Sequence, residues 1–400
     1  MKTIKTIKIK KGILIAFGEI FLKSEGVRNL FQKKLERNLV FFLKKEKIDF
    51  KIHYSRDRIF IETDEIKKVV EIIKNIFGIV WFAESFYFVS EKTFNKTYHK
   101  INLNELSKFI DDNYEEWIKK NETFAIRLKL EKNILKENRD KVIKIIAQNI
   151  DRKVNLSKPK KEMFIEIRRN GWFIYFKKQK GAGGLPAGSG GKVLSLISGG
   201  IDSPVSSYLS AKRGAENMWL HFHSFPLVSK KSIDKIEECV NIFLRYQIGL
   251  KIYFVPFSEA QIKIKAIAPA KYRVLLYRRL MLKTAEKIAE KENCSALITG
   301  ESLGQVSSQT LANLKITEEI VKIPVLRPLI AMDKEEIIKL AKEIDVFEIS
   351  IKPQEDCCTL FVSKGQTAKG NIEIVKELEK KIGINKMILE IMKKVEIKRY

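Results

Sequence analysis

The sequence predicts an α/β protein whose C-terminal half is a doubly wound parallel sheet, preceded by two smaller α/β units. In the second half of the chain, strand-like and helix-like runs alternate, which is typical of a parallel sheet wrapped by helices. The first half begins in a strand–helix–strand–strand–helix order and continues with a second set of such elements. Six glycines in the eleven residues 181–191 separate the two halves.

Composition narrows the class of protein. A hydrophobic content of 45% in 400 residues is ample for packed cores and excludes a disordered chain. Four cysteines, two of them adjacent, cannot form a disulfide framework, so we expect a reducing cytoplasm. The first ten residues lack an apolar stretch of signal-peptide length, and the apolar run 72–89 is interrupted by Lys74 and Glu84. We therefore predict a soluble cytoplasmic protein without a membrane segment.

The charge distribution predicts a polyanionic partner. The chain carries 76 basic and 49 acidic residues, a formal net charge of +27. Residues 1–180 hold 42 basic and 24 acidic side chains, whereas residues 181–400 carry a smaller excess of +9. This excess favours nucleic-acid binding by the first half. A lysine-rich genomic composition without function would also raise the charge, and charge alone does not separate RNA from DNA.

The first unit reads as a ferredoxin-like domain over residues 1–75. Its β-α-β-β-α order is that of a small α+β fold. Helical spacing of apolar residues marks the first helix, and alternation marks the strand pair. The expected elements are a strand at 12–17, a helix at 25–43, strands near 50–54 and 59–61 joined at 55–57, and a helix at 64–75.

A second α/β unit is expected over residues 76–180. Asn170-Gly171 between two apolar runs is a strong hairpin signal. Its other elements follow from alternation and from amphipathic spacing. They are strands at 79–89, 123–130, 163–167 and 172–176, and helices at 103–120 and 138–150.

The glycine-rich stretch 181–191 reads as a linker, and residues 192–400 as the parallel-sheet domain. The first strands are expected at 193–197, 218–222 and 251–257, and the first helices at 204–213 and 230–246. Ligands of such folds bind at the carboxyl ends of the strands.

The motif that carries the chemistry is Ser198-Gly-Gly-Ile-Asp-Ser-Pro204, directly after the first strand of this domain. Gly199 and Gly200 let the backbone approach an anion, and amides at a helix start form a phosphate site. Ser203 before Pro204 is expected to be the N-cap of the helix. The loop lacks the Lys-Ser/Thr pair of a Walker A motif. Its carboxylate, Asp202, suits a Mg²⁺ ion that is bound to pyrophosphate.

This string resembles the PP-loop of ATP pyrophosphatases, the adenine-nucleotide alpha-hydrolase-like fold. Further strings narrow the resemblance to the tRNA 4-thiouridine synthetases (tRNA sulfurtransferases, the ThiI family), and they span essentially the whole chain. The N-terminal and middle units are then similar to that family's ferredoxin-like and THUMP domains. The strings are Gly18-Glu-Ile20, Gly183-Gly-Leu-Pro-Ala-Gly188, Lys212-Arg-Gly214, His221-Phe-His-Ser224 and Thr299-Gly-Glu-Ser-Leu-Gly-Gln-Val-Ser-Ser-Gln309.

The resemblance implies an ATP site on the loop. The residues that it assigns to ATP are Leu196, Ile197, Ser198, Gly199, Gly200, Asp202, Ser203, His221, Phe222, Arg278, Gly300 and Gln309. Other interpretations stay open: Leu196 and Phe222 also suit a core, and Arg279 could take the place of Arg278. His221 and His223 could mimic a metal pair, but no third ligand is evident, so we predict no metal site.

The reaction that the resemblance implies is sulfur insertion at uridine 8 of tRNA. ATP adenylates the uridine O4, Mg²⁺ and Asp202 steady the leaving pyrophosphate, and a persulfide sulfur displaces AMP. Cys357, with Cys358 as the alternative, corresponds to the sulfur-handling cysteine. Cys239 and Cys294 read as packing residues.

Two departures from the family pattern bear on the sulfur source. No cysteine follows Cys358, so the second reactive cysteine of a rhodanese-like domain is missing. We therefore expect a separate donor: a cysteine desulfurase, another persulfide donor, or free sulfide. The chain has no Cys-x-x-Cys pair, so an iron–sulfur cluster is not expected.

The basic first half is then expected to hold tRNA. The candidate RNA contacts are Arg28, Lys33, Arg127, Lys129, Arg168 and Arg169. Alternatives are another PP-loop adenylating enzyme acting on RNA and a non-catalytic RNA-binding protein with a decayed nucleotide site. Sulfur transfer for the thiazole of thiamine, as a second role, and a homodimer also stay open.

Overall fold

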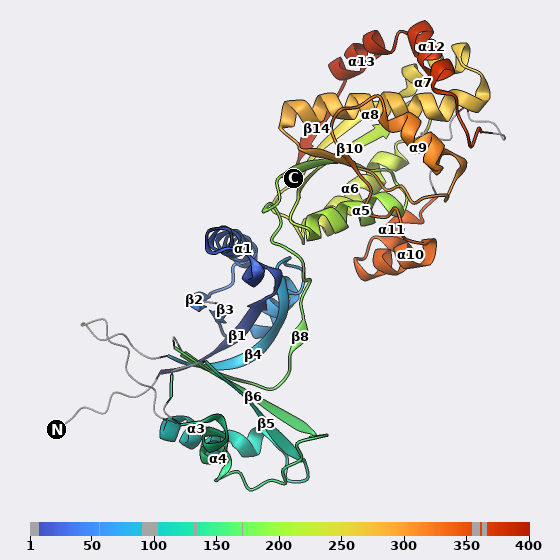
Figure 1. Ribbon diagram of the computed structural model, residues 1–400. Coiled ribbons are helices and arrows are strands. Elements are labelled where there is room, and N and C mark those ends of the chain that lie inside the picture. The colour runs from blue at the N-terminus through green and yellow to red at the C-terminus, as the bar shows by residue number, and fades with distance from the viewer. Residues whose placement is uncertain are drawn as a thin grey trace. The chain divides into compact units, whose positions relative to one another are not determined.

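The computed structural model describes residues 8–55, 57–89, 103–131, 134–135, 137–169, 171–353, 361 and 366–400 (Figure 1). The chain divides into two compact units. One contains residues up to 24 together with 39–183, and the other contains 25–38 together with 184–400. None of the helices in the described ranges combines the length and apolarity that a bilayer crossing requires.

The first unit is built on one sheet in the order β2-β3-β1-β4-β7-β6-β5, with β8 also pairing β4. Its strands are β1 (Lys8–Phe17), β2 (Lys51–Ser55), β3 (Arg58–Glu62), β4 (Ile79–Val89), β5 (Phe124–Leu130), β6 (Lys161–Arg168), β7 (Gly171–Tyr175) and β8 (Gln179–Lys180). The helices between these strands are η1 (Glu19–Leu22), α1 (Glu25–Lys45), α2 (Ile66–Ile73), α3 (Leu103–Trp117) and α4 (Arg139–Ala147). Residues 25–38 of α1 belong to the other unit.

Strand β4 joins the two α/β units that the sequence predicts. It pairs antiparallel with β1 along nearly its whole length and also with β7 of the hairpin. The two predicted units therefore share a single sheet rather than packing as separate layers. Helices α3 and α4 cover one face of β5, β6 and β7, where Ile165, Ile167 and Trp172 are buried. The opposite face of the sheet carries aromatic side chains, among them Phe60 and Tyr175.

The second unit confirms the predicted doubly wound sheet. Its strand order is β13-β12-β9-β10-β11-β14, and the neighbours from β13 to β11 are parallel. Only β14 runs antiparallel, along the edge of β11. The strands are β9 (Lys192–Leu196), β10 (Glu216–His223), β11 (Lys251–Pro256), β12 (Ala296–Ile298), β13 (Val325–Leu326) and β14 (Glu396–Arg399).

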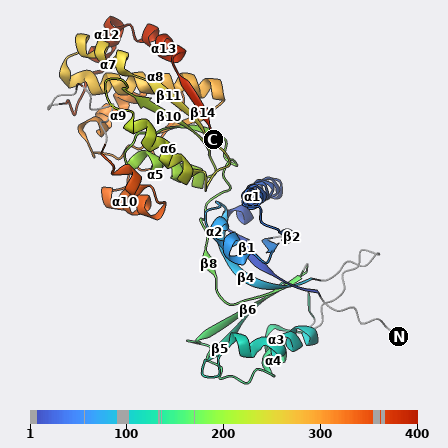
Figure 2. The ribbon, with the colours of Figure 1, turned by 180° about the vertical axis from the view of Figure 1, so that it is seen from behind.

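Helices cover both faces of this sheet. Helix α8 (Arg273–Glu292) contacts α7 (Ser258–Ile267), α12 (Ile372–Ile382) and α13 (Ile384–Lys393) on one face. Helices α5 (Asp202–Lys212) and α6 (Lys231–Phe243) pack against β10 from the other face, as the reverse view in Figure 2 shows. The remaining elements are η2 (Ala270–Tyr272), η3 (Ser307–Gln309), α9 (Leu311–Glu318), α10 (Lys334–Glu343) and α11 (Phe347–Ser350).

The core of the second unit lies between the sheet and α8. Leu220 and Phe222 of β10 pack there against Leu276 and Leu280 of α8. The strands are buried on both faces, which explains why they read as continuous apolar runs in the sequence. This core holds the strand ends rigid, and the candidate site is built on those ends.

Candidate active site

The Ser198–Ser203 loop follows β9, which lies between two parallel neighbours. Ser195 of β9 pairs with Trp219 of β10 on one side and with Ile298 of β12 on the other. The three strands therefore end at the same edge of the sheet. Because the chain leaves β9 toward β10 on one side, while β12 lies on the other, this edge is a topological switch point, where open α/β sheets bind ligands.

A cavity of about 460 Å³ opens at this edge. All but one of the residues that the sequence assigns to ATP line it. They are Leu196, Ile197, Ser198, Gly199, Asp202, Ser203, His221, Phe222, Arg278, Gly300 and Gln309. Gly200 is the exception; its amide donates to Ser198 Oγ at 3.3 Å. The fold thus brings together residues of β9, β10, α5, α8 and η3 and of the loops beside them, up to 113 residues apart in the chain, from Leu196 to Gln309.

The loop is closed by Ser203, although not as the sequence predicts. The expected N-cap is wrong: α5 begins at Asp202, and its N-cap residue, Ile201, makes no side-chain cap bond. Ser203 Oγ instead accepts from the Ser198 amide at 2.8 Å and donates to the Ser198 carbonyl at 3.1 Å. The hydroxyl therefore ties the two ends of the loop to each other.

Gly300 allows the loop after β12 to contact the start of α5. A Cβ at this position would lie 2.8 Å from Ser203 N and 2.9 Å from Asp202 C. Both atoms belong to the backbone, so no side-chain rotation could relieve the overlap. The glycine is required by close approach, as its place at a strand end predicts.

Asp202 forms an ion pair that the sequence does not reveal. Its Oδ1 lies 2.5 Å from Lys334 Nζ, and its Oδ2 accepts from Gln305 Nε2 at 3.2 Å. Lys334 begins α10, behind a capping box formed by Asp333 and Glu336. It lies 132 residues beyond Asp202 in the chain, so no local pattern could have linked the two.

The structure distinguishes the two adjacent arginines of α8. Arg278 lines the cavity and donates to the Ser308 carbonyl at 2.9 Å. Arg279 is 1% exposed and donates to Glu379 Oε1 at 2.6 Å and to Glu319 Oε2 at 3.1 Å. Arg278 is therefore the cavity residue, and Arg279 holds α9 and α12 against α8.

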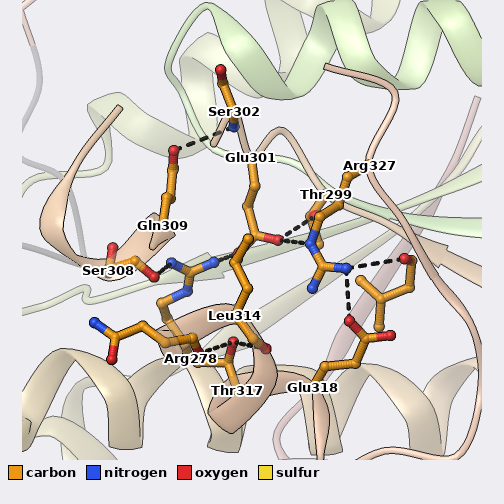
Figure 3. Close-up of polar contacts among 12 residues, drawn as sticks. Arg278, Thr299, Glu301, Ser302, Ser308, Gln309, Leu314, Thr317, Glu318 and Arg327 are labelled. Carbon is orange, nitrogen blue, oxygen red and sulfur yellow. Dashed lines mark hydrogen bonds and ion pairs between the residues drawn. The ribbon is translucent and has the colours of Figure 1, made fainter. Parts of the chain in front are cut away.

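Glu301 is a second cavity residue that sequence reasoning missed. Figure 3 shows this buried carboxylate between two guanidinium groups. It pairs with Arg278 on one side, and on the other its Oε2 accepts from Arg327 Nε at 2.6 Å and from Thr299 Oγ1 at 2.9 Å. Beside it, Gln309 Oε1 accepts from the Ser302 amide at 3.3 Å. The carboxylate thus orients Arg278 at the edge of the cavity.

His221 lies in the cavity wall as a neutral imidazole. It is 3% exposed, and burial lowers its pKa to about 4. Its Nδ1 lies 2.8 Å from the Ile197 carbonyl, so Nδ1 carries the proton, and Nε2 accepts from Ser232 Oγ at 3.3 Å. Both ring nitrogens are therefore engaged within the protein. Among the described residues, no group of three His, Cys, Asp or Glu could hold a metal ion.

The cysteines divide into two kinds. Cys239 and Cys294 are buried, and burial raises their pKa to about 12 and about 11, which confirms them as packing residues. Cys357 and Cys358 lie outside the described residues. Their assignment to sulfur handling stays a prediction.

The six candidate RNA contacts differ in exposure. Lys33, Lys129 and Arg169 are exposed, and Arg28 and Arg127 are half-buried. Arg127 donates to Glu162 Oε1 at 2.8 Å. Although its side chain reaches the surface, partial desolvation of its ammonium lowers the pKa of Lys129, and the nearby Glu166 opposes this shift.

Arg168 requires a correction, because it is 8% exposed and its guanidinium is held by Glu166 and Asp57. Glu166 also accepts from Arg58 and from the Tyr175 hydroxyl. In this buried cluster Arg168 neutralises carboxylates of the sheet, so it is not available as a surface contact. The sequence pattern of two adjacent arginines before a turn could not show this burial.

Comparison with protein families assigns all three parts of the chain. Residues 12–83 match the ThiI ferredoxin-like domain, residues 102–177 the THUMP domain, and residues 188–384 the family described as Thiamine biosynthesis protein (ThiI). These spans begin and end at other residues than the predicted domain limits, which stay predictions.

Relatives and a solved structure match over nearly the full length. The chain is 38% identical over 384 residues to a probable tRNA sulfurtransferase of Thermoanaerobacter sp. (strain X514), covering 94% of this chain and 96% of that one. It is 35% identical over 392 residues to that of Clostridium botulinum (strain Alaska E43), with coverages of 97% and 99%. A crystal structure of a 4-thiouridine synthetase–RNA complex with bound ATP matches with a TM-score of 0.84 and 31% identity, covering 98% and 99%.

Replacing the two adjacent arginines separately should give opposite results. Arg279→Ala leaves the buried Glu379 carboxylate without its cation and should lower the free energy of unfolding by about 3–5 kcal/mol. Arg278→Ala leaves the buried Glu301 paired with Arg327, so it should change stability by less than about 1 kcal/mol. It should weaken ATP binding roughly 10- to 100-fold, the value of one charge-assisted hydrogen bond. Urea unfolding and calorimetric titration with ATP measure the two effects. The reverse pattern would place Arg279, not Arg278, at the nucleotide.

Gly300→Ala should displace the start of α5 and lower the free energy of unfolding by about 1–3 kcal/mol, the usual cost of overpacking. Gly26→Ala is the control, since a Cβ there meets nothing within 4 Å and should stabilise α1 by up to about 1 kcal/mol. Urea unfolding of both variants measures the difference. Equal stability of Gly300→Ala and wild type would refute the close contact.

The buried neutral His221 predicts acid sensitivity. Its folded pKa of about 4 lies below the unfolded value of 6.5, so the unfolded chain binds more protons between these limits. Stability should therefore fall as the pH drops from 7 to 4.5, by about 2 kcal/mol from this residue. His223, whose pKa burial also lowers, acts in the same direction.

Urea unfolding of wild type and His221→Gln at both pH values isolates the contribution of His221. The variant should lose about 2 kcal/mol less on acidification than wild type. An identical loss in both proteins would mean that His221 titrates normally in the fold.

Proposed function

Because this chain belongs to the family of tRNA sulfurtransferases, we propose that it uses ATP to transfer sulfur to tRNA, making 4-thiouridine at position 8. Family membership confirms the resemblance that its motifs predict. The observation that carries the proposal is the cavity itself, where the Ser198–Ser203 loop, Arg278, Gly300 and Gln309 meet at one sheet edge. The related 4-thiouridine synthetase was crystallised with RNA and ATP bound, which supports both substrates.

The loop suits the activation step. Its amides stand at the start of α5, where unpaired N–H groups and the helix dipole attract phosphate oxygens. Arg278 supplies a guanidinium at the same cavity. In this step the uridine O4 attacks the α-phosphorus of ATP, the bond to the bridging oxygen breaks, and pyrophosphate leaves. The product is a uridine whose O4 carries AMP, so that C4 has a leaving group.

The Asp202–Lys334 pair suits the departing pyrophosphate. One carboxylate and one ammonium at the cavity offer a ligand for a cation and a donor for phosphate oxygens. A Mg²⁺ ion carried in with ATP would neutralise phosphate charge. Glu301 also lines the cavity but is paired with Arg278, so Asp202 is the carboxylate that suits this ion. Lys334 then orients Asp202.

The sulfur step needs a nucleophile from elsewhere in the chain. We assign it to Cys357, with Cys358 as the alternative, charged as a persulfide by a cysteine desulfurase or another persulfide donor, whose sulfur is already at the oxidation level of a persulfide. The terminal sulfur attacks C4 of the adenylated uridine, the C4–O bond breaks, and AMP leaves with that oxygen. A thiol must then reduce the remaining disulfide bond between the cysteine and the transferred sulfur, which releases 4-thiouridine.

The basic residues 1–180 suit the grip on tRNA. Lys33, Lys129 and Arg169 are exposed, and the net charge of residues 1–180 supports phosphate contacts that orient the substrate. A second role in making the thiazole of thiamine is supported by the family description of residues 188–384. That role would use the same cysteine persulfide and would not need the tRNA grip.

The proposed function is tested with purified protein, unmodified tRNA, ATP, Mg²⁺ and sulfide, reading 4-thiouridine by its near-ultraviolet absorbance. Asp202→Asn should lower the rate at least 100-fold while keeping the fold, since it removes the charge that Lys334 and the cation require. Asp333→Asn, which keeps an oxygen for the N-cap of α10, is the control and should stay within about threefold.

With a persulfide donor in place of sulfide, Cys357→Ala should abolish product and Cys358→Ala should retain it. The opposite result moves the nucleophile by one residue. If Asp202→Asn keeps full activity, the role of the loop in adenylation is wrong. If wild type makes no 4-thiouridine but consumes ATP with RNA, the enzyme is another PP-loop adenylating enzyme.

A further inference from the structure

A short segment between β10 and α6, residues 225–231, borders the nucleotide cavity, and we call it the rim segment. Ser224 before it, Val228 within it and Ser232 after it line the cavity. The six residues that lie between these three positions are exposed. The segment therefore follows the cavity wall, and its exposed side chains lie at the edge of the cavity.

Phe225 is an exposed aromatic residue at this edge. Within the described ranges of the second unit, the exposed aromatic residues are Phe225 and Tyr400, which are 40% and 42% exposed. Tyr400 follows the edge strand β14, and its hydroxyl donates to Glu237 Oε1 at 3.1 Å. Phe225 has no polar group that would account for its exposure. One exposed apolar side chain is common in soluble proteins, so its meaning depends on its neighbours.

Two lysines end the rim segment. Lys230 Nζ lies 4.9 Å from the ring centroid of Phe225, and Lys231 is the first residue of α6. The segment contains no acidic residue, and among the described residues no carboxylate forms an ion pair with either lysine. Both lysines lie at the N-terminus of α6, the positive end of the helix dipole, where cations are disfavoured. The stability of the helix therefore does not explain their presence.

An exposed ring beside two ammonium groups suits a nucleotide of RNA. Bases stack on aromatic side chains, and lysines attract the phosphates on either side. ATP in the cavity does not account for these side chains, because none of the six exposed residues of the rim segment lines the cavity. The proposed function needs a second substrate there, since the target uridine has to reach ATP. None of the six predicted RNA contacts lines the cavity either.

We propose that the rim segment binds the RNA beside the target uridine: Phe225 stacks on the adjoining base, and Lys230 and Lys231 bind the flanking phosphates. Single-stranded RNA is recognised in this way, with unstacked bases on aromatic rings. Holding the neighbouring base out of the helical stack lowers the cost of turning the uridine toward ATP. The exposed contact between Lys230 and the ring is weak, so the ammonium can move to a phosphate. The proposal rests on the proposed function in taking tRNA as the substrate.

Stacking is tested by the affinity for unmodified tRNA, measured by fluorescence anisotropy with α,β-methylene-ATP, which cannot release pyrophosphate. Phe225→Ala should weaken binding about 5- to 100-fold, the value of one stacked base, and Phe225→Tyr should bind as wild type does. Leu389→Ala is the control, since it removes a side chain that is 66% exposed on α13; it should not change the affinity.

Two further RNAs identify the base. One lacks the base at position 7 and the other lacks it at position 9, on either side of uridine 8. If Phe225 stacks on one of these bases, wild type and Phe225→Ala should bind the corresponding abasic RNA equally. The other abasic RNA should still show the difference between the two proteins.

The phosphate contacts are tested by the salt dependence of RNA binding. Lys230→Gln combined with Lys231→Gln should reduce the slope of log K against log salt by about 1.4, or roughly 0.7 for each phosphate of a single strand. The matched control combines Lys386→Gln with Lys393→Gln, two exposed lysines of α13, and should leave the slope unchanged. The affinity for ATP should be the same in all variants, because none of these residues lines the cavity.

Four results would overturn the proposal. They are unchanged RNA binding by Phe225→Ala, a loss that persists with both abasic RNAs, an unchanged salt slope, and a loss of ATP affinity as large as that of RNA affinity. Failure of both Phe225 variants to fold would also overturn it, by showing a packing role. If turnover with free sulfide is unchanged in Phe225→Ala but turnover with a protein persulfide donor falls, the segment binds that protein instead of RNA.

The proposed function can fail separately. If the effects on RNA binding are as expected but wild type makes no 4-thiouridine, the proposed function is wrong. The assignment of the rim segment to RNA would then stand.

Discussion

The parallel pairing of β9 with both β10 and β12 is the constraint on which the site depends. It brings the loop after Leu196, His221 of β10 and the Thr299-Gly300 turn to one edge of the sheet. Because the strands are buried on both faces, a one-residue slip would exchange core and cavity side chains and is strongly disfavoured. The absence of a side chain at Gly300 then lets the end of β12 touch the backbone of α5.

Charges at this edge are held in pairs, and the cation of one pair, Arg278, lines the cavity. Lys334 lies against Asp202, Glu301 orients Arg278 toward the nucleotide side, and His221 stays neutral. Lys235 holds the Gly199 carbonyl from behind the loop. This arrangement of paired charges favours the binding of an anion. When no anion is bound, the charges still have their partners within the protein. Such preorganised groups stabilise charge that develops in a transition state, because they need not reorient during the reaction.

Local signals in the sequence predicted the nucleotide loop well. A glycine pair between an apolar strand and a helix indicates a tight loop without information from the rest of the chain. The strand predicted at 193–197 and the helix predicted at 204–213 form near those limits. The N-cap was wrong because a serine hydroxyl has several local partners, and Ser203 bonds Ser198 instead. Sequence spacing alone does not choose between such bonds.

Long-range partners were beyond sequence reasoning. Lys334, Glu301 and Lys235 read as ordinary charged residues of helices and turns, and only the fold brings Lys334 to Asp202. The prediction of Arg168 as an RNA contact was wrong for the same reason, since its partners Glu166 and Asp57 meet it only in the folded sheet. The sequence also did not predict that the two α/β units share one sheet. Strand β4 pairs with strands of both units, and the pattern of apolar and polar residues in a strand does not indicate which strands it pairs with.

The most direct test of the account follows one oxygen atom. tRNA carrying ¹⁸O at O4 of uridine 8 would be converted with ATP and a sulfur donor, and the AMP and pyrophosphate analysed by mass spectrometry. If the loop activates uridine by adenylation, the label must leave with AMP, in a one-to-one ratio with the 4-thiouridine formed. Label in pyrophosphate or water, with unlabelled AMP, would contradict that claim.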